Sequence, residues 1–225
     1  MNAMQNPLFD FLSRLGANNN RPWFQEHKSE FDALREQWYA DLDRLIAVMT
    51  TEIPELASQT GRTASYRIYR DTRFSLDKTP YKTYFSALIS PWGRKLDRAA
   101  YYIHVGIEEC GLYTGIWNPP SPMLRKLRHA MIDNIDEFEE IINNPALKEY
   151  FHEWAGDRLK TVPKGWDRNH PYAHLLRLKD IGLVNTIDRD FFNNPDWPEV
   201  AARRLLLTRP LVDFLNYSID EETYS

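Results

Sequence analysis

Residues 62–82 read RTASYRIYRDTRFSLDKTPYK, a stretch that combines strong positive charge with regularly placed aromatic side chains. The local charge of this stretch is +4, whereas the whole chain has a net charge of −4. The stretch contains six cations and two carboxylates: Arg62, Arg67, Arg70, Arg73, Lys78 and Lys82, and Asp71 and Asp77. Aromatic rings are interspersed with these cations, at Tyr66, Tyr69, Phe74 and Tyr81. Guanidinium and ammonium groups beside rings are typical of sites for phosphate, carboxylate or nucleotide groups. The stretch therefore predicts an anion-binding site.

The segments around this stretch predict a mostly antiparallel β-sheet. Runs rich in β-branched and aromatic residues, separated by turn residues, predict four strands, at 63–70, 83–90, 99–107 and 111–118. The last two are close enough in sequence to form an antiparallel hairpin. A further strand is predicted at 179–186, which gives a sheet of about four to six strands.

Alternation along the strand at 99–107 separates two faces. It places Tyr102 and His104 on one face of the sheet. The opposite face carries mostly aliphatic side chains and is predicted to face the core, through Tyr101, Ile103, Val105 and Ile107.

Helical patterns flank the predicted sheet on both sides. Apolar residues recur every three or four positions from 23 to 49, and Asn6, Pro7 and Gly16 delimit a shorter helix before them. About three helices are predicted in 123–154, and further helices in 188–219, where Pro210 kinks or splits the last. These elements predict one α+β domain over residues 1–225, with a helical part at 5–53, a β-rich middle at 62–118 and a helical part at 120–220.

The composition favours a folded cytoplasmic protein. The chain has 225 residues, of which 43% are hydrophobic, which is enough to bury a sizeable core. A single cysteine, Cys110, excludes an intramolecular disulfide and a cysteine-based zinc site. No leader pattern and no apolar run near the ~20 residues of a membrane span are present, so no membrane association is predicted. The negative net charge argues against general binding to nucleic acid.

A long run resembles a known family. RIYRDTRFSLDKTPYKT (67–83), preceded by ANNNRPWF (17–24) and followed by YYIHV, GLYTGIW and LKTVPKGWDRNHP, resembles domain-of-unknown-function family 2461, a widespread bacterial family of conserved hypothetical proteins. The resemblance extends over nearly the whole chain. It implies a single cytosolic α+β domain and supplies no activity, substrate, cofactor or catalytic residue. Function is therefore inferred from the residues themselves.

Seven residues are the candidate ligand contacts: Arg67, Arg70, Arg73, Lys78, Tyr81, Lys82 and Tyr102. Strand alternation places Arg67 and Arg70 on opposite faces, so only a bend near Asp71 would bring Arg70 and Arg73 together. Converging guanidinium groups would bind one phosphate or carboxylate. Alternatively, Arg70 pairs with Asp71 or Asp77 and Arg73 with a helix C-terminus, and the pairs hold a long loop. Both interpretations stay open for the cluster.

Histidines offer weaker candidates for acid–base chemistry. His104 and His170 are the two candidate bases, with Asp71 or Asp77 as a carboxylate partner. A turn that begins at Asp167 explains His170 better than catalysis does. The six histidines show neither HxH nor HExxH spacing, so no metal site is predicted, and the sequence names no cofactor.

Three functions follow as hypotheses. The leading one is a binding module for a small phosphorylated or carboxylated molecule. The second is a hydrolase or transferase that acts on such a molecule, with a histidine–aspartate pair. The third is an interaction domain whose basic patch docks an acidic protein partner.

Overall fold

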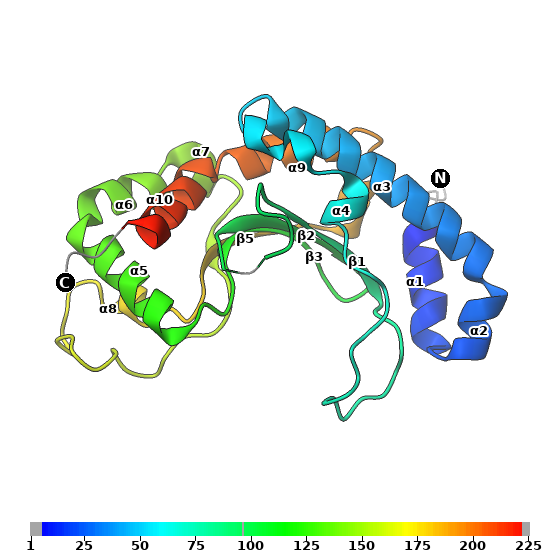
Figure 1. Ribbon diagram of the computed structural model, residues 1–225, viewed down its shortest axis with the longest axis horizontal. Helices are drawn as coiled ribbons and strands as arrows, with labels where there is room; N and C mark the ends of the chain where they lie inside the picture. Colours follow the sequence, from blue (N-terminus) through cyan, green and yellow to red (C-terminus); the bar gives the residue numbers. More distant parts are fainter. Residues whose placement is uncertain (1–5, 96, 222–225) are drawn as a thin grey trace. The chain divides into compact units, whose positions relative to one another are not determined.

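A computed structural model of the chain describes residues 6–95 and 97–221, which contain helices and a five-stranded antiparallel sheet (Figure 1). The strand order is β1-β2-β3-β5-β4. The strands are β1 (Tyr84–Ile89), β2 (Ala100–Gly106), β3 (Cys110–Ile116), β4 (Glu153–Trp154) and β5 (Ile181–Thr186). The predicted α+β class, with four to six mostly antiparallel strands, is confirmed.

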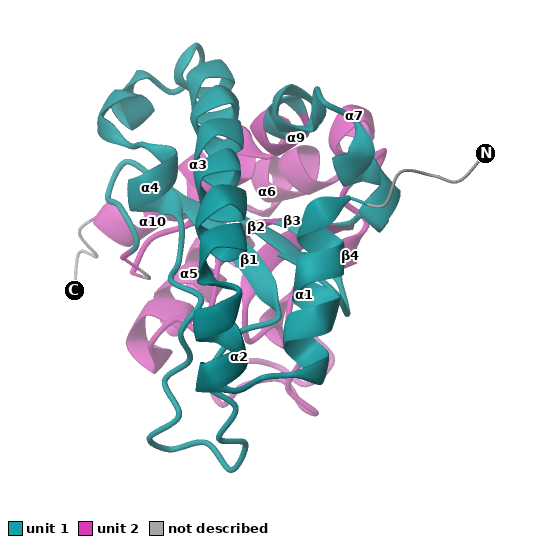
Figure 2. Cartoon of the chain, turned by 90° about the vertical axis from the view of Figure 1, so that its right-hand side faces the viewer, with its two compact units in different colours: residues 1–94, 102–112, 186–203 teal, residues 95–101, 113–185, 204–225 magenta. Residues whose placement is uncertain are grey.

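Backbone contacts divide the chain into two compact units (Figure 2). Unit 1 consists of residues 1–94, 102–112 and 186–203, and unit 2 of residues 95–101, 113–185 and 204–225. Each unit is built from three separate segments, so the two are interleaved along the sequence.

Unit 1 begins with a series of helices: α1 (Pro7–Ala17), α2 (Arg21–Glu26), α3 (Lys28–Thr50), the 3-10 helix η1 (Pro54–Ser58) and α4 (Gly61–Ala64). The side chains of Asn6 and Asn20 accept hydrogen bonds from the first turns of α1 and α2 and cap them. The predicted helix over 23–49 is confirmed except for a break at His27, which ends α2 and precedes α3.

One face of α3 forms much of the core of unit 1. The rings of Phe31 and Trp38 each lie 5.8 Å from the ring of Phe85 on β1. Trp38 also stacks on Trp197, with ring centroids 5.9 Å apart, where α9 (Trp197–Leu206) begins. All four side chains are buried, so the helical spacing of the apolar residues correctly indicated a core helix.

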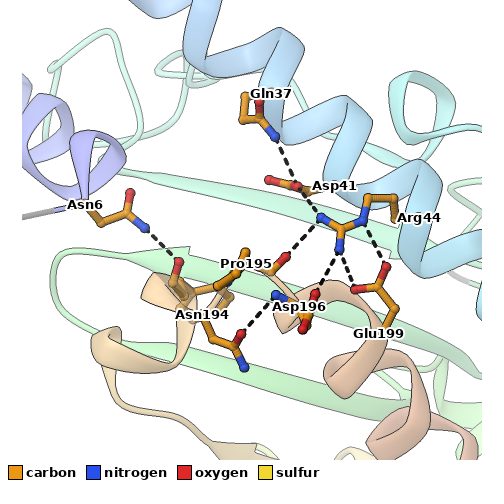
Figure 3. Close-up of polar contacts among 9 residues, drawn as sticks. Asn6, Gln37, Asp41, Arg44, Asn194, Pro195, Asp196 and Glu199 are labelled. Atoms are coloured by element: carbon orange, nitrogen blue, oxygen red, sulfur yellow. Dashed lines mark hydrogen bonds and ion pairs between the residues drawn. The ribbon is translucent and has the colours of Figure 1, made fainter. Parts of the chain in front are cut away.

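Arg44 of α3 fixes the segment that leads into α9 (Figure 3). Its guanidinium group donates two hydrogen bonds to the Glu199 carboxylate, at 2.9 and 2.8 Å, and one to the Pro195 carbonyl, at 3.0 Å. Asp41 and Asp196 lie 3.6 and 3.7 Å from the same guanidinium. A bidentate arginine–carboxylate pair is geometrically specific, so this network sets where the start of α9 lies along α3.

The predicted strand at 63–70 is wrong for most of its length. Its first two residues lie in α4, and the rest forms only isolated bridges, between Ser65 and Ala87 and between Tyr69 and Tyr81. Local hydrogen bonds explain the helical turn: Thr60 and Thr63 form a reciprocal capping box. The aromatic and β-branched residues indicated an extended chain, but the hydrogen bonds of this capping box favour a helical turn at residues 61–64.

Unit 2 contains the remaining helices, α5 (Ser121–Asp133), α6 (Ile135–Ile142), α7 (Pro145–Lys148), α8 (Ala173–Leu176) and α10 (Arg209–Asp220). Phe138 of α6 packs against Phe214 of α10, with ring centroids 5.3 Å apart. The helix predicted at 145–154 ends after one turn, at Lys148, and the chain continues into β4. Pro210 lies in the first turn of α10 and separates it from α9, in agreement with the predicted split.

Gly61 allows α4 to approach α3 closely. A Cβ atom at Gly61 would lie 2.9 Å from the carbonyl carbon of Tyr39 and 3.0 Å from the Cβ of Leu42, and it would collide with the Tyr39 carbonyl oxygen. The backbone of α3 cannot yield as a flexible side chain would. Any side chain at this position must therefore move α4 away from α3.

We therefore expect Gly61→Ala to lower the free energy of unfolding by roughly 1–3 kcal/mol, the usual cost of overpacking. Urea denaturation followed by tryptophan fluorescence measures the change. Ser58→Ala, at an exposed position just before α4, is the matched control and should change stability by less than ~0.5 kcal/mol. Equal stability of the two variants would contradict the close approach.

Candidate functional site

Two arms of unit 1, residues 65–70 and 80–87, run side by side and bring the basic residues together. The amide of Tyr66 donates to the Ser86 carbonyl at 2.9 Å, and the amide of Lys82 donates to the Ile68 carbonyl at 2.8 Å. The Arg70 amide also donates to the Pro80 carbonyl, at 2.9 Å. This pairing places Arg67 close to Lys82. Residues 70–80, which we call the loop, separate the two in the sequence.

Tyr81 anchors the base of this loop in the core. Its side chain is 2% exposed and stacks on the ring of Phe24, with centroids 4.0 Å apart. The side-chain amide of Asn19 bonds both backbone groups of Tyr81, at 2.9 and 3.1 Å. The ring of Tyr81 thus packs largely in the interior, and the prediction that Tyr81 contacts a ligand stays a prediction.

Arg70 is neutralised inside the loop. Its guanidinium donates to the carboxylate of Asp77 and to the hydroxyl of Thr79. Asp77 also accepts the Thr79 amide at 2.9 Å. The backbone bond from Thr79 and the bond from Arg70 lower the pKa of Asp77 to about 2. Asp77 is thus an acceptor that holds the loop, and not a free partner for a histidine.

Arg73 and Lys78 are also bonded within the loop. Arg73 forms two hydrogen bonds to Asp71, at 3.0 and 2.7 Å, which lower the pKa of Asp71 to about 2. The ammonium group of Lys78 donates to the carbonyl of Thr72 at 2.8 Å. For Arg70, Arg73 and Lys78 the geometry thus matches the loop-holding alternative, although the partner of Arg73 is Asp71 and not a helix terminus.

The loop extends away from the sheet, as Figure 1 shows for the segment between α4 and β1. Its tip exposes two apolar side chains, Phe74 at 95% and Leu76 at 103%. The internal ion pairs hold this extended shape while the apolar tip faces solvent.

Five half-buried residues form a second group, which we call the tyrosine–lysine cluster: Tyr66, Lys82, Tyr84, Tyr102 and His104. The rings of Tyr84 and His104 lie 4.3 Å apart, and those of Tyr66 and Tyr102 lie 6.3 Å apart. Tyr102 and His104 share a face of β2, and Tyr101, Ile103 and Val105 on the other face are buried. Strand alternation predicted this arrangement from the sequence.

Two cations lie over rings of the cluster. The Lys82 Nζ atom lies 5.4 Å from the ring of Tyr66 and 5.4 Å from that of Tyr84. The Arg94 guanidinium lies 5.5 Å from the Tyr66 ring and donates to the Ser65 carbonyl at 2.7 Å. Burial, together with the charges of Arg67 and Arg94, lowers the pKa of Lys82. Arg67 and Arg94 are therefore each close enough to Lys82 to repel its ammonium group.

In the part of the chain that the structure describes, no acidic side chain pairs with Arg67, Lys82 or Arg94. Within residues 6–95 and 97–221, no carboxylate oxygen lies within 4.0 Å of a side-chain nitrogen of Arg67, Lys82 or Arg94. This distinguishes the tyrosine–lysine cluster from the loop, where each arginine has its own aspartate.

His104 links the cluster to a carboxylate. Its Nδ1 atom lies 3.4 Å from the Tyr102 hydroxyl, and its Nε2 atom lies 4.0 Å from Glu109. Burial and the charge of Lys82 lower the pKa of His104, and Glu109 opposes that shift. These surroundings thus favour the neutral imidazole, which is able to accept a proton. Gly106 makes room for its ring, because a Cβ there would lie 2.9 Å from the Nε2 atom.

Small pockets lie beside the arms. One of about 120 Å³ is lined by residues of α3 and of both arms, among them Arg35, Tyr39, Tyr66, Arg67 and Tyr84. Its volume equals that of roughly four water molecules. Another, of about 260 Å³, lies at the base of the loop and is lined by Arg21, Gln25, Tyr69, Arg70, Thr72, Pro80 and Tyr81.

The other sequence candidates have structural roles. Asp167 accepts the Asn169 amide at 2.9 Å, and His170 accepts the Tyr172 amide at 3.1 Å, so this segment of unit 2 is a bonded turn. No group of three histidine, cysteine or acidic residues that would hold a metal occurs within 6–95 and 97–221. In the same part of the chain, no helix is long and apolar enough to cross a membrane.

Sequence reasoning did not find Arg94, Tyr84 or Glu109 as members of the site. Arg94 follows Gly93, which has a φ of 69° in a turn after β1. The dipeptide Gly93-Arg94 is a turn signal that would have placed the cation near the end of a strand. Nothing in the sequence pattern indicates that this turn folds back toward Tyr66.

We expect Asp77→Asn to loosen the loop, because the variant loses the charged acceptor of Arg70. Limited trypsin digestion at neutral pH, with mass spectrometry of the fragments, should show faster cleavage after Arg70, Arg73 and Lys78. In the wild type, the pKa of Asp77 is lowered from 3.8 to about 2. The stabilising ion pair between Arg70 and Asp77 is therefore fully present above pH 3.8, and it is lost as the pH falls toward 2 and the carboxylate is protonated.

Asp157→Asn is the control for this experiment. It removes an exposed ion pair with Lys179, 3.4 Å long, from unit 2. Cleavage in the loop should stay at the wild-type rate. If Asp77→Asn is cleaved no faster than this control, the ion pairs do not hold the loop.

The comparisons with known proteins assign the chain to a family. The family model described as "Conserved hypothetical protein (DUF2461)" matches residues 7–214. Neither the curated proteins nor the solved structures contain a match. Because the matched region includes α1, the loop, the whole sheet and most of the C-terminal helices, the chain belongs to the DUF2461 family of conserved hypothetical proteins.

Proposed function

We propose that the protein binds a small molecule with a phosphate or carboxylate group at the tyrosine–lysine cluster. One observation supports this proposal: burial and the charges of Arg67 and Arg94 lower the pKa of Lys82, yet no carboxylate of residues 6–95 and 97–221 lies within 4.0 Å of a side-chain nitrogen of these three cations. Like charges held together raise the free energy of the folded state. A bound anion offsets this repulsion.

The chemistry of the surrounding groups fits such a ligand. Guanidinium groups bind phosphate or carboxylate through two parallel hydrogen bonds and stay charged at every physiological pH. The tyrosine hydroxyls add donors, and the rings add flat surfaces for an organic portion. The adjacent 120 Å³ pocket is below the roughly 300–1,000 Å³ typical of drug-sized ligands, which favours a ligand of a few heavy atoms.

A thermal-shift titration tests the proposal. Pyrophosphate should raise the melting temperature of the wild type by roughly 5–10 °C at about 100 times its Kd. Arg67→Gln and Arg94→Gln should each reduce that shift, because each removes one cation from the site. Arg73→Gln is the matched control, since Arg73 pairs with Asp71 in the loop, and it should respond like the wild type. A shift of equal size in all four proteins, or none in the wild type, would contradict the proposal.

A second candidate function, hydrolysis or group transfer on the same ligand, is favoured by the surroundings of His104. A neutral imidazole lies between a tyrosine hydroxyl at 3.4 Å and a carboxylate at 4.0 Å. A histidine that contacts a hydroxyl at one ring nitrogen and a carboxylate at the other is oriented as a general base. Glu109 takes the carboxylate role for which Asp71 and Asp77 were the sequence candidates.

For this second function we expect His104→Gln to lower the rate with an active phosphate or carboxylate ester by about 10²–10⁴-fold. The pyrophosphate-induced thermal shift should persist, because the cations remain. His152→Gln, at an exposed position in unit 2, is the control and should keep the wild-type rate. Turnover that survives in His104→Gln would exclude His104 as the base.

The proposal also concerns the location of the protein and its partners. The single cysteine, Cys110, suits the reducing cytoplasm, and we place the protein there. We expect no general affinity for nucleic acid, because the net charge is −4. An acidic protein partner is less well supported, because Arg70, Arg73 and Lys78 are already bonded within the loop.

A further inference from the structure

The amine of Lys82 has surroundings different from those of other lysines in the described chain. Lys28 pairs with Asp32 at 2.5 Å and Lys179 with Asp157 at 3.4 Å. Lys126 and Lys78 donate to backbone carbonyls instead. Lys82 has two tyrosine rings at 5.4 Å and no carboxylate of residues 6–95 and 97–221 within 4.0 Å.

Opposing effects determine the charge of this amine. Contacts with aromatic faces favour the ammonium form. Burial and the two neighbouring guanidinium groups act in the other direction and lower the pKa of Lys82. A lysine that is partly desolvated beside other cations is more often present as the neutral amine, which is nucleophilic.

A proton acceptor contacts the same tyrosine ring as this amine. The ring of His104 lies 4.3 Å from the ring of Tyr84, and the Nζ atom of Lys82 lies 5.4 Å from that same ring. Tyr102 lies 3.4 Å from one ring nitrogen and Glu109 lies 4.0 Å from the other. A proton released by Lys82 can therefore pass to a neutral imidazole whose resulting charge faces a carboxylate.

We propose that Lys82 is a nucleophile that forms an imine with a small carbonyl compound bearing a carboxylate or phosphate group, such as a 2-oxo acid. The inference rests on the proposed function, because Arg67 and Arg94 bind the anionic group and thereby hold the carbonyl carbon near the amine. The reactants then meet within one site, as rapid addition requires.

The reaction balances without an oxidant or reductant. Lys82 gives a proton to His104, and its nitrogen lone pair then forms a bond to the carbonyl carbon. The electron pair of the C=O double bond moves to oxygen, and one proton moves from the nitrogen to that oxygen, which gives a neutral carbinolamine. His104 then returns its proton to the hydroxyl group, the C–O bond breaks, and one water molecule leaves as the nitrogen lone pair forms the C=N bond of a protonated imine.

Reductive trapping tests this inference. The purified protein is treated with glyoxylate and sodium cyanoborohydride, which reduces an imine to a stable secondary amine. Tryptic peptides are then mapped by mass spectrometry over time. We expect Lys82 to be modified about tenfold faster than exposed lysines such as Lys160 and Lys164, a gain of the kind that binding and orientation provide.

Two comparisons separate a bound carbonyl compound from general amine reactivity. Propionaldehyde is similar in size but has no anionic group, so its preference for Lys82 should be smaller. Replacing both Arg67 and Arg94 by glutamine should slow labelling by glyoxylate and leave labelling by propionaldehyde less affected. Lys82→Arg keeps the positive charge and should lose the adduct while retaining the thermal shift with pyrophosphate.

The possible outcomes distinguish this inference from the proposed function. Adducts spread evenly over the lysines, while pyrophosphate still stabilises the wild type, would overturn the imine and leave anion binding intact. Even labelling without any stabilisation would overturn both. Selective labelling of Lys82 that is unchanged in the double arginine variant would show a reactive amine without the proposed anion site, and would also count against the inference.

Discussion

The antiparallel pairing of residues 65–70 with residues 80–87 is the constraint on which the site depends. Three backbone hydrogen bonds of 2.8 to 2.9 Å connect the arms, and each such bond contributes about 0.5–1.5 kcal/mol. Tyr81 adds the buried stack on Phe24, and Asn19 bonds both of its backbone groups. Because the arms cannot slide, Arg67 and Lys82 must stay close together despite their mutual repulsion.

The positive charges near the loop have two kinds of surroundings. In the loop, each arginine has an aspartate two or seven residues away, and the pairs determine backbone shape. Exposed pairs contribute little to global stability, so their effect is local. At the tyrosine–lysine cluster, Lys82 and Arg94 lie over tyrosine rings, and Arg94 also donates to a carbonyl. Within residues 6–95 and 97–221, no carboxylate oxygen lies within 4.0 Å of the side-chain nitrogens of these two cations.

Much of the fold could be predicted because it depends on local pattern. Alternation along β2 separated Tyr102 and His104 from the core, and apolar periodicity over residues 23–49 identified the core helix α3. Asn6 marked the start of α1 because capping is a contact within one turn.

The parts that could not be predicted depend on contacts between distant segments. The buried position of the Tyr81 ring is set by Phe24 and Asn19, which lie far from it in the sequence. Arg94 joined the site through a turn that has no periodic signal. In each case a tertiary partner, absent from any sequence window, decided the outcome.

The single thiol of the chain provides a means to observe motion near the site. Cys110 is 3% exposed at the start of β3, and its sulfur contacts the carbonyl of Gly106 at the end of β2. A thiol reagent in solution can reach that sulfur only when the β2–β3 hairpin opens locally, and a chain with one cysteine gives one signal. The rate of thiol modification thus measures how often the strand that carries His104 separates from its neighbour, without any cysteine being introduced.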